Sequence, residues 1–181
     1  MPRIAPATAP YEPAIAEALQ RVMPPGIEPL LLFRTLAKSP RVFEKIFAGS
    51  LLSKGPLTLR HREIVIDRTT ARLGCEYEWG VHIALFAERA KLDAEQVVAL
   101  VNGPGDAACW SPEEQALLAL VDDLVDHHTI AEPTWTALAR HFDEAQILEA
   151  IALAGAYHTI SFLCNGLSLP LESYGARFPS A

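Results

Sequence analysis

The chain has 181 residues, of which 50% are apolar and 20% are charged, a length and composition that suit one packed domain and exclude an intrinsically disordered chain. Its formal charge is −7, from 22 acidic and 15 basic residues. No Lys/Arg run forms the basic stripe that phosphate binding requires, so we expect no nucleic-acid partner.

Residues 1–10 are expected to be a mobile N-terminal arm. Pro, Ala and Thr dominate this stretch, and no apolar run follows Arg3 as it would in a signal peptide. From residue 11 to residue 181, apolar residues recur at helical spacing and no useful stretch alternates with period two. The sequence therefore predicts one all-α domain, a multi-helix bundle, over residues 11–181.

Three short helices are predicted first. One covers Tyr11 to Met23 and is stopped by the turn-forming cluster Pro24-Pro25-Gly26. Pro29 opens a second helix that reaches about Lys38. Ser39-Pro40 then supplies an N-cap and a proline at the first helical position for a third, which extends roughly to Ser50.

Two longer helices follow the break at Gly55-Pro56. Thr58 is the predicted N-cap of the first, which Gly74 ends, and the second is predicted from Cys75 to about Lys91. In the first of them Ile64 and Val65 belong to the apolar side. The predicted polar side comprises Arg60, Arg62, Asp67 and Arg68.

Further helix starts are marked by capping boxes, in which a cap oxygen and an acid or amide three residues later satisfy the first backbone N–H groups. Asp126 to Ile130 is a predicted connection, and Pro133 starts a short helix through His141. The apolar stretch from Ile147 to Leu163 predicts a buried central helix, because Glu149 interrupts it as a membrane span. About nine helices result. The three boxes begin at Asp93, Ser111 and Asp143.

Three cysteines, Cys75, Cys109 and Cys164, are far apart and odd in number, so we expect no disulfide framework and a reducing, cytoplasmic location. His127 and His128 are adjacent and would point apart on a helix, and no other set has metal-ligand spacing, so no metal is predicted. No Gly-rich loop suggests a nucleotide, and no cofactor is expected.

The candidate catalytic residues are Cys75, Glu78, His82 and Glu63. Spacings of three and four place the first three along one face of a helix, and Glu63, on the preceding helix, could fold back onto that face. In the first turn of its helix Cys75 would gain from the helix dipole, whereas two nearby carboxylates would oppose its ionisation. Cys75 and His82 would lie about 10 Å apart along the axis, too far for a direct pair. Glu78 and His82 form a plausible acid–base pair.

Three further residues are candidates for lining a substrate pocket. Tyr77 and Trp79 flank the polar cluster, although aromatic residues in such positions are more often structural. His158 belongs to the apolar central helix, where a core histidine is the default interpretation and presentation to the pocket the alternative.

The spacing of Glu63, Cys75 and His82, with eleven and six intervening residues, resembles the active-site frame of the alkylhydroperoxidase D-like group. The redox members of that group carry Cys-x-x-Cys, whereas here Cys-Glu-Tyr-Glu-Trp puts Glu78 at the second position. The stretch G-C-E-Y-E-W-G-V-H also resembles the carboxymuconolactone decarboxylases, which implies that His82 transfers protons with Glu78 as its partner. The resemblance implies a small all-helical protein that forms dimers, trimers or hexamers.

Three hypotheses for function follow. The first is a peroxidase-type, thiol-dependent oxidoreductase in which Cys75 is the nucleophile and Glu63 orients the proton-handling pair. An external thiol, or a movement of Cys164 or Cys109, would then restore Cys75. The second is a decarboxylase-like lyase or isomerase in which His82 and Glu78 act on a small carboxylated molecule. The third is a helical assembly module with a vestigial site.

Overall fold

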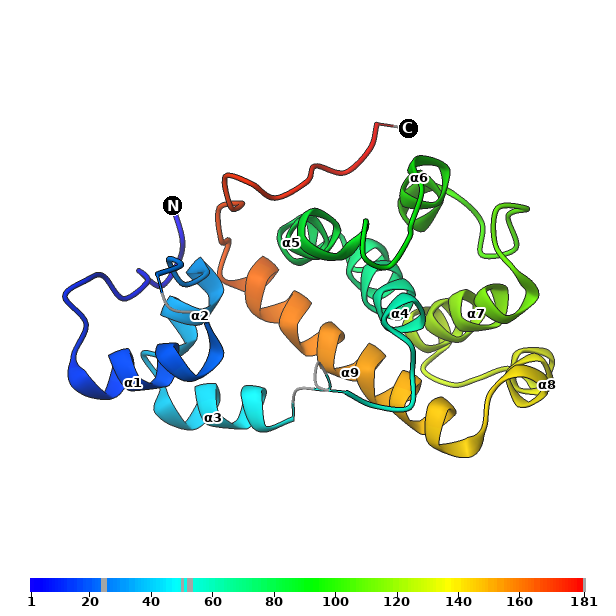
Figure 1. The fold of residues 1–181 in the computed structure, drawn as a ribbon, viewed down its shortest axis with the longest axis horizontal. Coiled ribbons are helices and arrows are strands. Elements are labelled where there is room, and N and C mark those ends of the chain that lie inside the picture. Colours follow the sequence, from blue (N-terminus) through cyan, green and yellow to red (C-terminus); the bar gives the residue numbers. More distant parts are fainter. Residues whose placement is uncertain (24–25, 50, 52–53, 181) are drawn as a thin grey trace.

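A computed structural model describes residues 1–23, 26–49, 51 and 54–180. These residues form an all-α domain without strands, which confirms the predicted fold class and the number of about nine helices (Figure 1). The predicted turn residues Pro24-Pro25 and the predicted end of the third helix at Ser50 lie outside the described ranges. The helices are α1 (Pro13–Val22), α2 (Leu31–Leu36), α3 (Pro40–Ala48), α4 (Leu59–Arg72), α5 (Glu76–Phe86), α6 (Ala94–Asn102), α7 (Pro112–His127), α8 (Glu132–His141) and α9 (Glu144–Gly166).

Local capping signals begin four of these helices as predicted. Thr58 caps α4 by accepting a hydrogen bond from the His61 N–H. The three capping boxes are complete, at Asp93 for α6, Ser111 for α7 and Asp143 for α9. Ser39 is the N-cap residue of α3 and Pro40 its first helical residue, as predicted, but the side chain of Ser39 makes no cap hydrogen bond.

Two predicted helix ends differ from the structure. Helix α5 ends at Phe86, five residues before the predicted Lys91. The chain turns there because the Leu92 N–H bonds to the Ala87 carbonyl and Lys91 takes a positive φ of 56°. In the predicted connection of residues 126–130, α7 continues to His127 and stops at His128, whose φ is 59°.

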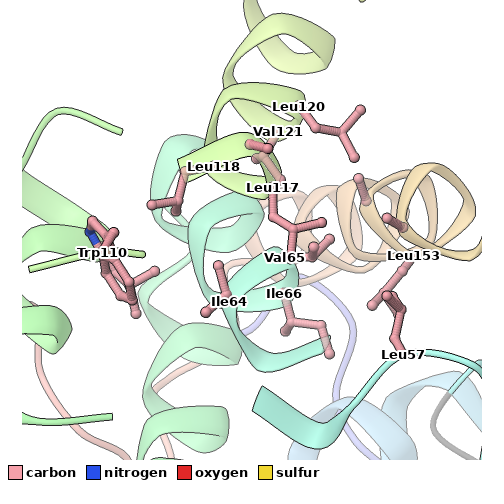
Figure 2. Close-up of a cluster of buried hydrophobic side chains, with 14 of the residues drawn as sticks. Leu57, Ile64, Val65, Ile66, Trp110, Leu117, Leu118, Leu120, Val121 and Leu153 are labelled. Atoms are coloured by element: carbon pink, nitrogen blue, oxygen red, sulfur yellow. The ribbon is translucent and has the colours of Figure 1, made fainter. Parts of the chain in front are cut away.

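Helix α4 lies at the centre of the larger hydrophobic core. It packs against α5, α6, α7 and α9, and Ile64, Val65 and Ile66 are fully buried among leucines of α7 and α9 (Figure 2). Asp67 and Arg68, predicted on a polar side, are buried as well. Arg68 is tolerated there because its guanidinium forms two 2.8 Å hydrogen bonds with Asp122 and others with backbone carbonyls.

A second, smaller core joins α1–α3 to one end of α9 and to the start of α5 (Figure 1). Its members include Cys75, Cys164, Val81 and Leu169. Residues 1–10 run along this part of the molecule, and the Arg3 and Ala7 N–H groups donate to the Leu167 and Arg34 carbonyls. The mobility predicted for this arm stays a prediction that hydrogen exchange can test.

The segment after α9 returns across α5, as the red trace in Figure 1 shows. The Ala176 N–H donates to the Gly80 carbonyl, and the Phe178 N–H donates to the Glu76 side chain. A side chain at Gly80 would meet the Ala176 carbonyl oxygen at 2.3 Å, so glycine is required for this approach. The C-terminal segment therefore covers the helix that carries Glu78 and His82.

Helix α9 is long and apolar enough to cross a membrane by length and composition. Core helices of globular folds share this property. In the structure α9 packs against α4, α5, α7 and α8 and runs diagonally through the bundle (Figure 1). Helix α9 is therefore central, as the sequence predicted, but it is only partly buried.

Candidate active site

The candidate site lies where α4, α5 and α9 meet. Glu63 comes from α4, Glu78 and His82 come from α5, and Cys75 is the residue immediately before α5. Cys75 is the N-cap of this helix, one position before the predicted first turn, and follows Gly74, whose φ of 60° sets the chain reversal. All four side chains are buried.

Three groups near the Cys75 sulfur favour its ionised form. The largest effect comes from the thiol of Cys164 on α9, followed by the backbone N–H of Glu78 and the hydroxyl of Ser161, which lies beyond hydrogen-bond distance. Burial and the Glu78 carboxylate act in the opposite direction, but the net effect is that the pKa of Cys75 is lowered from its ordinary value. The sequence left the sign of this shift open.

His82 is held at both ring nitrogens. Its Nδ1 lies 2.7 Å from Glu63 Oε2, and its Nε2 lies 3.0 Å from the hydroxyl oxygen of Tyr157 on α9. Glu78 Oε1 is 3.6 Å from the same Nε2, as the spacing of four residues predicted. Burial alone would lower the pKa of His82, but the pairing with Glu63 and Glu78 outweighs it and raises this pKa to about 10.

Buried acids outnumber buried cations around this histidine. Asp67 joins Glu63 and Glu78, and each of the three has one side-chain oxygen without a hydrogen-bond partner among the described residues. Burial raises the pKa of Asp67, His82 counteracts this, and the charges of the two glutamates add to the increase. The cluster can therefore store and transfer protons, since several of its groups compete for the same ones.

Three of these side chains also have the composition of a cation site. One ligand atom each of Glu63, Asp67 and His82 lies within 4.8 Å of the others. The sequence predicted no metal because the spacing along the chain shows no ligand set, and only the packing of α4 on α5 forms this one. Glu63 and His82 already bond to each other, which accounts for two of the three groups without an ion.

Of the three predicted pocket candidates, Tyr77 and Trp79 make structural contacts beside the site, and His158 lies elsewhere. The Tyr77 hydroxyl donates to Glu172 at 2.6 Å and accepts from the Leu32 N–H, so it ties α5 to α2 and to the C-terminal segment. Trp79 packs against Phe178 of that segment. His158 lines a separate hollow of about 220 Å³ between α7 and α9. Cys109 belongs to the other core, so the fold keeps it apart from Cys75.

Sequence reasoning named Cys164 as a residue that could reach Cys75, but it missed Tyr157 and Ser161 of the same helix. Tyr157, Ser161 and Cys164 are spaced by four and three residues, which places them on one face of this helix, and this face is turned toward His82 and Cys75. The periodicity of the helix was a usable signal, because Tyr157 and His158 are adjacent in the sequence and their side chains therefore point to different sides of α9. Which of the two faces the site depends on how α9 packs.

Comparison with known protein families gives a match for this sequence. The carboxymuconolactone decarboxylase family matches residues 39–123, a stretch that includes Glu63, Cys75, Glu78 and His82. No curated protein matches the chain.

Solved structures share the fold at low sequence identity. An uncharacterized peroxidase-related protein from Ralstonia eutropha JMP134 with an alkylhydroperoxidase AhpD core is 22% identical, with a TM-score of 0.78 over 94% of this chain and 93% of that one. A peroxidase-related protein from Silicibacter sp. TM1040 is 15% identical, with a TM-score of 0.74 over 97% and 96%. A variant of the debrominase Bmp8 in complex with 2,3,4-tribromopyrrole is 14% identical, with a TM-score of 0.69 over 94% and 92%. Sequence match and fold agree: residues 39–123 match the carboxymuconolactone decarboxylase family, and the whole chain shares its fold with structures of the alkylhydroperoxidase D-like type.

Proposed function

We propose that this protein is a thiol-dependent oxidoreductase that reduces a hydroperoxide or a related small electrophile, with Cys75 as the nucleophile. The family match supports an enzyme that acts on a small molecule. The observation that carries the proposal is the position of Cys75, which is buried at the start of α5 between the Cys164 thiol and the Glu78–His82 pair, surroundings that lower its pKa. A thiolate is the reactive form of cysteine toward peroxides.

The reaction is written with the Cys75 thiolate attacking one oxygen of the peroxide bond. A sulfur–oxygen bond forms, the oxygen–oxygen bond breaks, and the alkoxide that leaves takes up a proton. Glu78 lies between Cys75 and His82. Its backbone N–H is near the Cys75 sulfur, and its carboxylate lies 3.6 Å from His82 Nε2. His82 supplies the proton through Glu78, and Glu63 holds the imidazole in place.

Reduction of the Cys75 sulfenic acid back to the thiol requires two electrons from a thiol outside the site. We propose a small dithiol or a protein thiol as reductant, which a reducing compartment such as the cytoplasm supplies. The fully buried position of Cys75 implies that the cover over α5 opens during the cycle.

Peroxide consumption with dithiothreitol as reductant tests the proposal. Cys75→Ser should abolish turnover of hydrogen peroxide and cumene hydroperoxide, and His82→Gln should lower it about 100-fold or more. Cys109→Ser is the matched control and should keep the wild-type rate. Turnover that survives in Cys75→Ser would rule out the thiol mechanism.

A second candidate function rests on the completeness of the cluster around His82. Glu63, Glu78 and Tyr157 contact this histidine without any part played by Cys75, which suits proton transfer on a small carboxylated substrate. Proton exchange or ring opening in a panel of lactones and small carboxylic acids, followed by NMR, distinguishes the two. The acid–base enzyme would remain active as Cys75→Ser and lose activity as His82→Gln.

A further inference from the structure

Cys164 is the one cysteine that the fold brings to Cys75. It lies in the last turns of α9, far from Cys75 in sequence, and the two thiols are close enough for each to shift the pKa of the other. Both side chains are almost completely buried, at 0% and 2% exposure, and both belong to the smaller core. The pair is therefore sealed among apolar side chains that include Val81 and Leu169.

The environment distinguishes the roles of the two sulfurs. The Glu78 N–H and the Ser161 hydroxyl also lie near the Cys75 sulfur and favour its thiolate. The proximity of Cys75 and burial raise the pKa of Cys164, so Cys164 keeps its proton. One sulfur is prepared for attack and the other is held as a thiol beside it.

We propose that Cys164 is the resolving cysteine of this enzyme and forms a disulfide with Cys75 in each catalytic cycle. This assignment rests on the proposed function, because it starts from a Cys75 sulfenic acid. The Cys164 sulfur attacks the Cys75 sulfur, the sulfur–sulfur bond forms, and the hydroxyl group leaves with the Cys164 proton as water. An external dithiol then reduces the disulfide, is itself oxidised to a disulfide, and returns both cysteines to thiols.

The arrangement replaces the second cysteine that the sequence lacks three residues after Cys75. Glu78 occupies that position, so neighbouring residues of α5 cannot form a disulfide. The fold supplies the second sulfur from α9 instead. Cys109 does not compete, because it packs with the larger core between α6 and α7.

Intact-protein and peptide mass spectrometry test the assignment. The full-length protein is reduced, freed of reductant, treated with one equivalent of hydrogen peroxide, blocked with N-ethylmaleimide under denaturing conditions and digested without reduction. The wild type should lose about 2 Da before blocking, as two hydrogens leave, and should yield a peptide that links Cys75 to Cys164. Cys109 should remain alkylated.

Variants separate the steps. Cys164→Ser and Cys164→Ala should gain about 16 Da at Cys75, trapped by dimedone as the sulfenic acid, and should yield no linked peptide. Cys109→Ser, the matched control, should form the Cys75–Cys164 link as the wild type does. Two replacements of Cys164 are used, with circular dichroism on each, so that a folding defect in one does not decide the result.

The outcomes distinguish this inference from the proposed function. A wild type in which dimedone traps Cys75 and no Cys75–Cys164 peptide forms would overturn the resolving role while the thiol oxidoreductase stands. A Cys75 that the peroxide leaves unoxidised would overturn both. A link from Cys75 to Cys109 in the folded protein would also reject Cys164 as the resolving residue.

Discussion

At His82, the contacts that fix the orientation of the ring also fix its charge. Glu63 occupies Nδ1, and Tyr157 and Glu78 surround Nε2. With a pKa raised to about 10, the imidazole is protonated at neutral pH, and both N–H groups donate. The sequence suggested a general acid or base near neutral pH, and the buried carboxylates favour the acid.

Stability should depend on pH through this histidine. The folded-state pKa of His82, about 10, lies above the ordinary 6.5, so its contribution is complete below about pH 6.5 and is lost as pH rises through about 10. The free energy of unfolding, measured with urea between these values, should fall with pH. His82→Gln should flatten this dependence, whereas the exposed control His141→Gln should keep it. Equal slopes in the wild type and His82→Gln would contradict the raised pKa.

Tyr157 should contribute to stability through its hydroxyl group. Tyr157→Phe leaves His82 Nε2 with only Glu78 at 3.6 Å, and loss of one partner of a buried polar group costs about 1–3 kcal/mol. Urea denaturation at pH 7 measures the difference. Tyr174→Phe, at an exposed position, should change the free energy of unfolding by less than about 0.5 kcal/mol. Equal stabilities for the two variants would show that the Tyr157 hydroxyl contributes nothing.

Among the elements, the C-terminal segment decides how α5 is exposed to solvent. It approaches at Gly80, where backbone meets backbone, and it is held at its two ends by Glu172 and Phe178. Glu172 accepts from the Tyr77 hydroxyl and from the Leu31 N–H, so it also reaches the N-terminal helices. The C-terminal segment therefore contacts the first turns of α5, directly after Cys75.

A pair of glycine substitutions tests whether this segment limits access to Cys75. In Gly80→Ala the new methyl group would lie 2.3 Å from the Ala176 carbonyl oxygen, so the segment must shift, at a cost of about 1–3 kcal/mol. Alkylation of Cys75 by N-ethylmaleimide should then become faster than in the wild type. Gly155→Ala, on α9 with open space around it, should instead stabilise the protein by about 0.5–1 kcal/mol. Unchanged alkylation in a destabilised Gly80→Ala would mean that reagents reach Cys75 by another route.

At the scale of the whole molecule, α9 connects the two hydrophobic cores and keeps an outward face. Its inward residues contact α4, α5 and α7, while Leu148 and Phe162 are 67% and 65% exposed. Large apolar side chains on one exposed helix face are typical of surfaces that bind another protein. This face is compatible with the homo-oligomer that the sequence resemblance implied.

Sedimentation velocity over a range of concentrations tests self-association. We expect the wild type to form dimers or larger assemblies, and Phe162→Glu to shift them toward the monomer because it places a charge in an apolar contact. Val98→Glu, at another exposed apolar position on α6, is the matched control and should not change the distribution. A wild type that sediments as a monomer at every concentration would show the oligomer prediction to be wrong.

Sequence alone determined the features that depend on neighbours along the chain. The capping boxes at Asp93, Ser111 and Asp143 begin their helices as predicted, because cap hydrogen bonds join residues three positions apart. The contact between Glu78 and His82 followed from the same local geometry. The end of α5 did not follow from local geometry. The helix stops at Phe86, and the Ala87 carbonyl accepts a hydrogen bond from the Leu92 N–H instead of continuing the helix.

Only the tertiary structure decided which distant groups meet. Packing of α9 on α5 turns Tyr157 toward His82 and Cys164 toward Cys75, and packing of α7 on α4 buries Arg68 beside Asp122. The periodicity of a helix defines its faces, but the side to which each face is turned depends on the hydrophobic burial of all helices together. The sequence therefore contained the residue types of the site, and the fold determined the pKa values and the partner of Cys75.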